Sequence, residues 1–502
     1  MKKSYLVICL ITLLLSVLKT NNKQVSNNDI PLADKVILPG DVNNDNKITA
    51  QDYVLIRKYI LKQINFTDEE FRKADYNNDN KITAQDYVLV KKVLMEDVKI
   101  SGITLNTMNK TMDAGTTFKI TTTVYPENSK NKEITYISSN PSVATVSNEG
   151  LVLARHDGEA TITVKTSNGN KEANCLIKVQ NGNSHLYGWS QTEADKHFGP
   201  ILEGIFNGKT IETIKEKDIG KTFNMHFPDM AYVNGKIYAY YITYNTKTGK
   251  GGVGLAISSD GINFENKGCV IEPDQDYDKN GAYFAGVWID NGIYYLVYES
   301  KGAENSSYGT LENVALATSS DGINWNKKGV ILYKDTNENW QKANVGTPDL
   351  YKSGDTWYLT FHGYNYTDCQ IGVAYGKDLT NLKVHNNPVI PTEDNTLHSG
   401  TTGRRDVIYI NGWYYMVYEI STDANGNFGN AKWTHQFARS KDMINWTSVS
   451  LPLIKQKNAD GTDKNGFGYD GPCWVIINDH IYVYFRDTNN ATTRAELTLK
   501  LK

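Results

Sequence analysis

The sequence predicts a mainly β protein in which a five-bladed β-propeller, residues 186–502, follows a small β-sandwich and a small α-helical module. Three patterns support this fold class. An aromatic strand motif recurs five times in the C-terminal part, residues 98–180 alternate apolar and polar positions, and a 34-residue repeat rich in Asp and Asn lies closer to the N-terminus. Radial repetition of short strands is typical of propellers. A chain of 502 residues also suggests about three domains.

Composition limits the classes of partner. The chain has 53 Lys and Arg against 56 Asp and Glu, a net charge of −3, which argues against nucleic acid or an anionic membrane as the main partner. After Met1-Lys2-Lys3 an apolar run extends from Tyr5 to Leu18. This run predicts a signal peptide over about residues 1–20 and a secreted protein, with a retained N-terminal anchor as the alternative. It is too short for a comfortable transmembrane span. The single, widely spaced cysteines predict buried thiols and no zinc site.

The N-terminal repeat has the spacing of a calcium-binding loop. The segment from Asp41 to Asp52 recurs from Asp75 to Asp86, with oxygen-bearing side chains at loop positions 1, 3, 5 and 12. Position 7 contributes a backbone carbonyl, which completes the oxygen cage that Ca²⁺ needs. Two Ca²⁺ ions are therefore predicted. The expected ligands are Asp41, Asn43, Asp45, Lys47 and Asp52 in the first loop and Asp75, Asn77, Asp79, Lys81 and Asp86 in the second.

A helical apolar pattern follows each loop, and the whole stretch, residues 36–97, resembles a dockerin of the cellulosome type. The resemblance implies a cohesin domain as the partner. Ala50-Gln51 and Ala84-Gln85 occupy the loop positions at which dockerins carry recognition residues. Because the two pairs are identical, the resemblance allows docking in either of two orientations.

Residues 98–180 are predicted to form the β-sandwich. Period-two strands such as Phe118–Val124 and Ala160–Val164 are separated by clusters of turn-forming residues. The segment Tyr136–Val146, with Gly150 and Gly158 after it, resembles a bacterial Ig-like domain of group 2. This resemblance implies a spacer or an adhesive module, and we assign no chemistry to it.

The five aromatic strands define the register of the propeller blades. Their aligned tyrosines are Tyr238, Tyr295, Tyr358, Tyr415 and Tyr482, and in four blades an Asp-containing hairpin turn follows. Nine residues before each tyrosine, where the inner strand starts, stand Asp229, Gly286, Asp349, Asp406 and Cys473. Inner strands converge on the propeller axis, so the three aspartates are expected to face one shared funnel. An ordinary turn or cap role remains the alternative for each of them.

The architecture resembles the five-bladed propeller glycosidases related to arabinanases and β-xylosidases. In those enzymes a carboxylate base, a pKa-tuning Asp and a Glu acid come from the first three inner strands. Here Asp229 is the candidate base, but Gly286 and Asp349 stand where the other two carboxylates are expected. Glu299 and Glu419, at the far ends of aromatic strands, are weaker candidates. Glycoside hydrolysis requires two carboxyl groups of unequal pKa, and the sequence does not clearly supply them.

A second pattern favours a metal. In His226-Phe-Pro-Asp229, Pro228 can kink the strand entry and turn both polar side chains into the funnel. His with Asp suits a divalent ion, and His362 and His398 lie near the same predicted mouth. Glu193, in the segment that begins at Trp189, precedes the first blade and is placed to reach it. For each histidine, a purely structural hydrogen-bonding role is the alternative.

This set resembles the propeller deacetylases that remove the N-acetyl group from terminal α-GalNAc of the blood group A antigen. The resemblance implies a divalent metal held by Asp229 and His398, with His362 as a further ligand. It implies Glu193 as general acid and base and His226 as stabiliser of the oxyanion. Ser190, Asp349 and Asp406 are the expected substrate-binding residues. Metal-assisted N-deacetylation of a glycan is thus the leading functional prediction. A glycoside hydrolase and a non-catalytic glycan-binding propeller are the alternatives.

Overall fold

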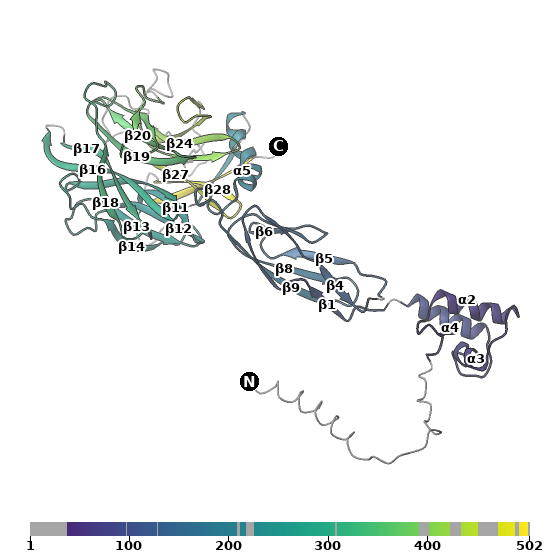
Figure 1. The fold of residues 1–502 in the computed structure, drawn as a ribbon. Coiled ribbons are helices and arrows are strands. Elements are labelled where there is room, and N and C mark those ends of the chain that lie inside the picture. Colours follow the sequence, from purple (N-terminus) through teal and green to yellow (C-terminus); the bar gives the residue numbers. More distant parts are fainter. Residues whose placement is uncertain are drawn as a thin grey trace, which may run out of the picture. The chain divides into compact units, whose positions relative to one another are not determined.

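The computed structural model describes residues 38–96, 98–127, 129–207, 211–216, 225–306, 309–390, 401–421, 433–449, 470–486 and 491–499. The predicted signal peptide lies outside these residues. The chain divides into two compact units, Met1–Val98 and Lys99–Lys502, which are described separately (Figure 1). None of the described helices combines the length and apolarity required to cross a membrane.

Among its described residues, the first unit contains three helices: α2 (Ala50–Ile60), α3 (Asp68–Ala74) and α4 (Ala84–Met95). Thr49 and Thr83 cap α2 and α4, and the capping boxes are completed by Asp52 and Asp86, the last residues of the two predicted calcium loops. Each loop therefore ends inside the first turn of a helix. The small core contains Val42, Ile56, Ala74 and Val90, and Tyr53 stacks on Tyr87 with 4.0 Å between ring centroids.

The second unit begins with the β-sandwich. It contains a four-stranded sheet in the order β2-β9-β8-β5, a three-stranded sheet β3-β7-β6 and the pair β1-β4. The buried side chains of alternating positions in β8 and β9 form its core. The strands are β1 (Gly102–Leu105), β2 (Asn109–Asp113), β3 (Thr117–Lys119), β4 (Thr122–Tyr125), β5 (Ile134–Ser138), β6 (Ala144–Val146), β7 (Leu151–Ala154), β8 (Gly158–Thr166) and β9 (Glu172–Gln180).

Five four-stranded antiparallel sheets follow, which confirms the predicted mainly β fold with a five-bladed propeller. Blade 1 contains β11 (His226–Val233), β12 (Lys236–Thr243), β13 (Gly252–Ser258) and β14 (Glu265–Ile271). Blade 2 contains β15 (Gly281–Asp290), β16 (Ile293–Ser306), β17 (Gly309–Ser319) and β18 (Asn326–Leu332). Blade 3 contains β19 (Asn344–Ser353), β20 (Thr356–Tyr364), β21 (Cys369–Gly376) and β22 (Lys383–Val384). Blade 4 contains β23 (Thr402–Ile410), β24 (Trp413–Ser421), β25 (Trp433–Ser440) and β26 (Trp446–Ser448).

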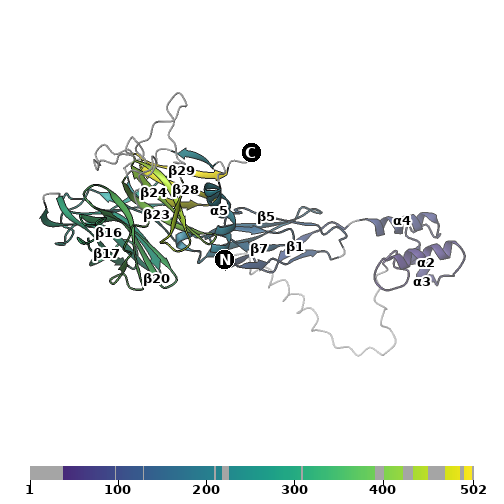
Figure 2. The ribbon, with the colours of Figure 1, turned by 90° about the horizontal axis from the view of Figure 1, so that it is seen from above.

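Blade 5 joins the two ends of the propeller sequence. Its sheet has the order β10-β29-β28-β27, so β10 (Ile211–Glu216), which precedes blade 1, is the outer strand of the last blade. The other strands are β27 (Asp470–Ile477), β28 (His480–Arg486) and β29 (Thr492–Leu499), and β28 and β29 lie side by side in Figure 2. The ring is thus closed by main-chain hydrogen bonds between segments at opposite ends of the propeller.

Every inner strand is interrupted near its start. In blades 1, 2, 3 and 5 the pairing register shifts over the three residues that lead to the axis position, for example between His226 and Asp229, and in blade 4 it shifts one residue earlier, between Thr402 and Arg405. A β-bulge redirects side chains and increases strand twist. In blades 1, 2, 3 and 5 the bulge contains a residue of positive φ, and the four residues are Phe227, Phe284, Thr347 and Gly471.

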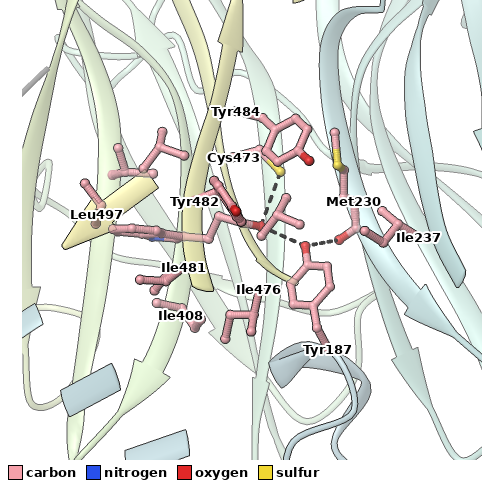
Figure 3. Packing of buried hydrophobic residues seen from close by; sticks show 14 of the residues in the cluster. Tyr187, Met230, Ile237, Ile408, Cys473, Ile476, Ile481, Tyr482, Tyr484 and Leu497 are labelled. Atoms are coloured by element: carbon pink, nitrogen blue, oxygen red, sulfur yellow. Dashed lines mark hydrogen bonds between the residues drawn. The ribbon is translucent and has the colours of Figure 1, made fainter. Parts of the chain in front are cut away.

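The segment between sandwich and propeller packs against both. The short helix η1 (Ser184–Leu186) precedes Tyr187, whose hydroxyl donates hydrogen bonds to the carbonyls of Met230 and Trp474 near the axis (Figure 3). Helix α5 (Gln191–Phe206) follows, and its buried face extends the largest apolar core. Trp189, fully buried, receives the Arg155 guanidinium over its ring at 4.8 Å. These contacts bind the sandwich to the propeller as one unit.

Candidate active site

A cavity of about 560 Å³ lies where the inner strands begin. All five blades contribute to it, because its wall includes the bulge or entry residue of every inner strand. Four carboxylates and two basic side chains face it together with several aromatic rings. The lining residues are Phe227, Phe284, Glu299, Lys301, Glu312, Asn344, Thr347, His362, Tyr364, Cys369, Thr402, Gly403, Glu419, Trp433, Asp470 and Arg486.

Glu299 lies in the middle of β16, the second strand of blade 2. Its Oε2 accepts a hydrogen bond of 3.0 Å from the Thr347 N–H in the bulge of blade 3. Burial and the nearby Glu312 raise the pKa of Glu299 to about 8, although Lys301 and the Thr347 N–H act in the opposite direction. At neutral pH Glu299 is therefore a protonated, buried acid that faces the cavity.

Glu419 occupies the corresponding place in blade 4 and has a different environment. Its Oε1 accepts from the Arg404 N–H at 2.7 Å and its Oε2 accepts from the Gly471 N–H at 2.6 Å. Burial and Asp470 raise its pKa to about 7, with both N–H bonds opposing that rise. Hydrogen bonds from two backbone amides favour the charged form. Glu419 is thus oriented through both oxygens, and it accepts one more N–H bond than Glu299 in support of its charged form.

Two ion pairs flank these glutamates. The Arg486 Nε donates to Asp470 at 2.9 Å, and the Lys301 ammonium binds Glu312. Both pairs are only partly accessible to solvent, so their electrostatic interactions are screened less than those of surface pairs. The cavity therefore contains two paired anions and two glutamates that titrate near neutrality.

His362 lies beside Glu299 and Glu312. Its Nδ1 is 2.8 Å from the Thr347 hydroxyl, to which Arg405 Nη2 donates at 2.6 Å. Burial lowers the pKa of His362 to about 3, so the imidazole is neutral. Ligand atoms of His362, Glu299 and Glu312 all lie within 4.8 Å of one another, a spacing that suits a metal ion. The Lys301 ammonium already provides a cation to this cluster.

The three aspartates at the inner-strand positions lie together, but in a second, much smaller cavity of about 30 Å³ on the axis. Asp229 accepts from the Val287 N–H of the next blade at 2.7 Å and from Arg404 Nη2 at 3.2 Å. Asp406 accepts from the Trp474 N–H of the next blade at 2.6 Å. Burial raises the pKa of Asp229 to about 6 and that of Asp406 to about 8, and it raises the pKa of Asp349 strongly.

The other predicted site residues are dispersed. Ser190 Oγ accepts from the Glu193 N–H as the cap of α5, and the Glu193 carboxylate binds Lys196 at 2.9 Å and Arg155 at 3.4 Å. Glu193 therefore joins α5 to the β-sandwich and is not among the described residues that line the larger cavity. His226 is half-buried, and burial and Arg486 lower its pKa. His398 lies outside the described residues.

One register position explains most of the cavity. Four residues after the aligned tyrosines stand Ile242, Glu299, His362, Glu419 and Arg486, and all but Ile242 line it. Side chains separated by an even number of strand residues share a face. The second strands therefore present these four side chains on equivalent faces, and all four line the cavity. Sequence reasoning followed the inner strands and missed Lys301, Glu312, Asp470 and Arg486. The aligned fourth position was the available signal.

Comparison with known families identifies all three parts of the chain. Residues 39–95 match the dockerin type I domain and residues 99–177 match the bacterial Ig-like domain of group 2, which confirms both resemblances. Dockerin domains bind calcium, in agreement with the paired loops. Residues 228–399 and 405–498, together more than half of the chain, match the N-terminal domain of glycosyl hydrolases family 32.

Individual relatives are more distant. Sucrose-6-phosphate hydrolase of Escherichia coli is 28% identical over 28% of this chain and 32% of its own length. The 1,2-beta-oligomannan phosphorylase of Thermoanaerobacter sp. strain X514 is 28% identical over 54% of this chain and 88% of its own length. A thermostable family-43 glycoside hydrolase of known structure is 17% identical, with a TM-score of 0.43, over 56% of this chain and 90% of that chain. The chain spans about a fifth to a third of the length of the first curated relatives it matches.

These matches correct the leading functional prediction. The propeller was expected to be a metal-dependent N-deacetylase, but the family that it matches consists of glycosyl hydrolases. The prediction of amide hydrolysis on α-GalNAc is therefore wrong. The alternative, a glycoside hydrolase with a five-bladed propeller, agrees with the match.

Proposed function

Since the chain belongs to the family defined by the N-terminal domain of glycosyl hydrolases family 32, we propose that its propeller hydrolyses a glycosidic bond with Glu299 and Glu419 as the catalytic pair. One observation carries this assignment. Two buried glutamates at the same register position of blades 2 and 4 face one cavity, and their surroundings give them different pKa values. Unequal titration of two carboxyl groups is what separates an acid from a base in glycoside hydrolysis.

Glu299 is the proposed general acid. Its pKa of about 8 keeps the proton in place at neutral pH, and Thr347 restrains only its Oε2 by an N–H hydrogen bond. A protonated Glu299 donates its proton to the oxygen of the departing sugar as the glycosidic bond breaks. When Glu312 is ionised, its charge raises the pKa of Glu299 and helps to keep that proton bound.

Glu419 is the proposed partner carboxylate. It is ionised above about pH 7, and its two N–H bonds fix the position of the charge. The carboxylate attacks the anomeric carbon directly in a retaining mechanism, or it activates a water molecule in an inverting one. Hydrolysis requires Glu299 to be protonated and Glu419 to be ionised, and the raised pKa values of the two glutamates place the expected optimum near neutral pH.

The cavity is matched to a neutral sugar. The Asp470–Arg486 and Glu312–Lys301 pairs cancel their charges, and protonation makes Glu299 neutral. The glycan on which the enzyme acts is expected outside the cell, because the dockerin implies attachment to a cohesin-bearing scaffold. We propose that two Ca²⁺ ions support the dockerin. In the propeller, Lys301 takes the place of a metal beside Glu299, Glu312 and His362.

The test begins with product analysis on sucrose, raffinose and β-1,2-linked mannooligosaccharides, with and without inorganic phosphate. Hydrolysis predicts a free reducing sugar whether or not phosphate is present. A product that forms only with phosphate, as a sugar phosphate, would replace hydrolysis by phosphorolysis. Proton NMR of the first product anomer then decides between retention and inversion.

Variants test the two roles separately on any aryl glycoside that the wild type cleaves. Glu299→Gln is expected to lose activity on poor leaving groups and to keep it on 2,4-dinitrophenyl glycosides, which need no proton. Glu419→Gln is expected to lose activity on both. Glu265→Gln, at an exposed surface pair, is the matched control. Full activity in either cavity variant on natural substrate would refute the assignment.

A further inference from the structure

Two phenylalanines in the cavity wall have a strained backbone conformation. Phe227 has φ 51° and Phe284 has φ 48°, at the equivalent bulge of blades 1 and 2. Positive φ is rare for bulky side chains, and such conformations persist where the surrounding structure or a function demands them. Both rings are only half-buried, and their centroids lie 4.9 Å apart at an angle of 60°. They form an aromatic corner that is exposed to the cavity.

Glycines, in contrast, stand beside the two proposed catalytic glutamates. Gly346 lies opposite Glu299, Gly403 lies opposite Glu419, and a side chain at either glycine would collide with the carboxylate. Blade 5 carries Gly471 at the bulge, where a side chain would collide with Phe227. The two glycines beside the carboxylates stand one residue before the position of the phenylalanines, where blades 1 and 2 carry His226 and Tyr283. Blades 3 and 4 thus have no side chain at the place where the two carboxylates need room.

The aromatic corner continues beyond the cavity as a row of tyrosine rings. The Tyr283 ring lies 6.5 Å from Phe284, and the Tyr244 ring lies 6.5 Å from Tyr283. Tyr244 is 62% exposed, so the row leads from the cavity to the surface of blade 1. Sugar rings present a face of C–H groups, and aromatic side chains with an apolar body and a polar tip suit such a surface at a wet interface.

From this arrangement we propose that Phe227 and Phe284 form the platform under the sugar whose bond is cleaved, and that Tyr244 contacts the next sugar of the chain. The inference rests on the proposed function and adds a direction to the substrate. The chain enters over blades 1 and 2, and its terminal bond lies against Glu299 and Glu419. The enzyme is therefore expected to bind oligosaccharides, whose leaving group is itself a sugar, more tightly than glycosides that lack a second sugar.

The outer contact is tested with Tyr244→Ala in the full chain. The variant is expected to raise KM about tenfold for a trisaccharide and to leave KM for an aryl glycoside of the same sugar unchanged, because an aryl group does not reach Tyr244. Tyr333→Ala, at a tyrosine that is 65% exposed and outside the cavity lining, is the matched control. Equal effects of Tyr244→Ala on the two substrates, or none on either, would overturn this contact.

The inner platform is tested with Phe284→Tyr, Phe284→Leu and Phe284→Ala. The aromatic variant is expected to retain activity, while Leu and Ala lose about tenfold or more in kcat/KM on every substrate, including aryl glycosides. Circular dichroism melting identifies variants that fail to fold. Wild-type activity in a folded Phe284→Leu would reject the platform.

Binding separates this inference from the proposed reaction. Calorimetric titration of the trisaccharide into Glu299→Gln measures affinity without turnover. The same titration is then made with the double variant Glu299→Gln, Tyr244→Ala. A fall in affinity with Tyr244→Ala supports the subsite even if the wild type releases no product. An unchanged affinity would refute the Tyr244 subsite even if hydrolysis is established.

Discussion

The propeller contains two groups of buried carboxylates that differ in what they bind. Asp229 and Asp406 accept main-chain N–H groups across blade boundaries, Asp229 also binds Arg404, and the axial aspartates enclose almost no free volume. The carboxylates at the strand entrances, Glu299 and Glu419, also accept N–H bonds but face a cavity large enough for a sugar. Both groups occupy repeated positions of the blades, so position in the repeat does not distinguish them. Open volume beside a carboxylate is what indicates a role in chemistry.

The largest expected effect concerns the cavity group. Glu299→Gln and Glu419→Gln are each expected to reduce kcat/KM on natural substrate by roughly 1,000-fold or more, which is within the range for loss of an acid or base. Glu299→Gln keeps an oxygen acceptor for its single N–H partner, so its melting temperature should remain close to that of the wild type. Glu419→Gln replaces one of two acceptor oxygens by an NH2 group that faces an N–H, which is expected to cost about 1–3 kcal/mol of stability. Steady-state kinetics and calorimetry measure the two quantities on the same preparations. A variant that lost stability but retained its specific activity would show that the cavity glutamates, like the axial aspartates, have a structural role.

The axial group should respond in the opposite way. Asp229→Ala removes the acceptor for the Val287 N–H and leaves the buried Arg404 without its carboxylate. Breaking a buried pair in this way is expected to cost about 3–5 kcal/mol of unfolding free energy. Urea denaturation at pH 7 measures the loss. Activity per folded molecule should fall far less than in Glu299→Gln, and an equal fall would place Asp229 in the reaction.

The pH profile sharpens the comparison within the cavity. The ordinary pKa of Glu is 4.5, and in the folded protein Glu299 retains its proton up to about pH 8. Activity should therefore decline as pH rises through about 8 and as it falls through about 7, where Glu419 takes up a proton. With the 2,4-dinitrophenyl glycoside the decline near pH 8 should disappear, since no proton is donated. A decline that persists would point to another group.

The free energy of unfolding should also depend on pH, because the pKa of the axial Asp406 is raised in the folded protein. The pKa of Asp406 rises to about 8 from an ordinary 3.8, so the folded state binds a proton that the unfolded state releases. Its contribution is fully present below about pH 4 and is lost progressively up to about pH 8. Asp406→Asn, which cannot ionise, should flatten this part of the stability curve. Thermal unfolding from pH 4 to pH 9 provides the measurement, and an unchanged slope would contradict the assignment.

The smallest expected effect is that of metal removal on catalysis. EDTA should change hydrolysis by less than about twofold, because the Lys301 ammonium accompanies Glu312 and no metal step is proposed. The same treatment should abolish binding to a cohesin, because the dockerin loops lose their calcium. Activity and cohesin pull-down are compared before and after restoring calcium. Loss of both functions together would indicate a metal in the propeller.

The sequence was sufficient for the architecture and insufficient for the site. The aromatic strands, the calcium loops and the alternating sandwich strands are local patterns, so their repetition predicts the three folds directly. The site, in contrast, depends on which end of each strand opens to solvent, and the sequence pattern does not show this. The repeat drew attention to the aligned inner-strand residues Asp229, Asp349 and Asp406. Their bulges turn them towards the axis, whereas Glu299 and Glu419 reach the cavity from the second strands. Glu193 was misleading because its partner, Arg155, lies in another module.

The pairing of β10 with β29 has a consequence for biosynthesis. Residues Ile211–Glu216 leave the ribosome long before Thr492–Leu499, and until the latter appear, the edge of β10 has no partner strand. Contacts of such large sequence separation form slowly, and an unpaired strand edge invites association with other chains. The dockerin and the β-sandwich can fold while synthesis continues, but the ring can close only after Thr492–Leu499 have been added. A nascent chain that stops before these residues would therefore retain its scaffold anchor and lack a closed propeller.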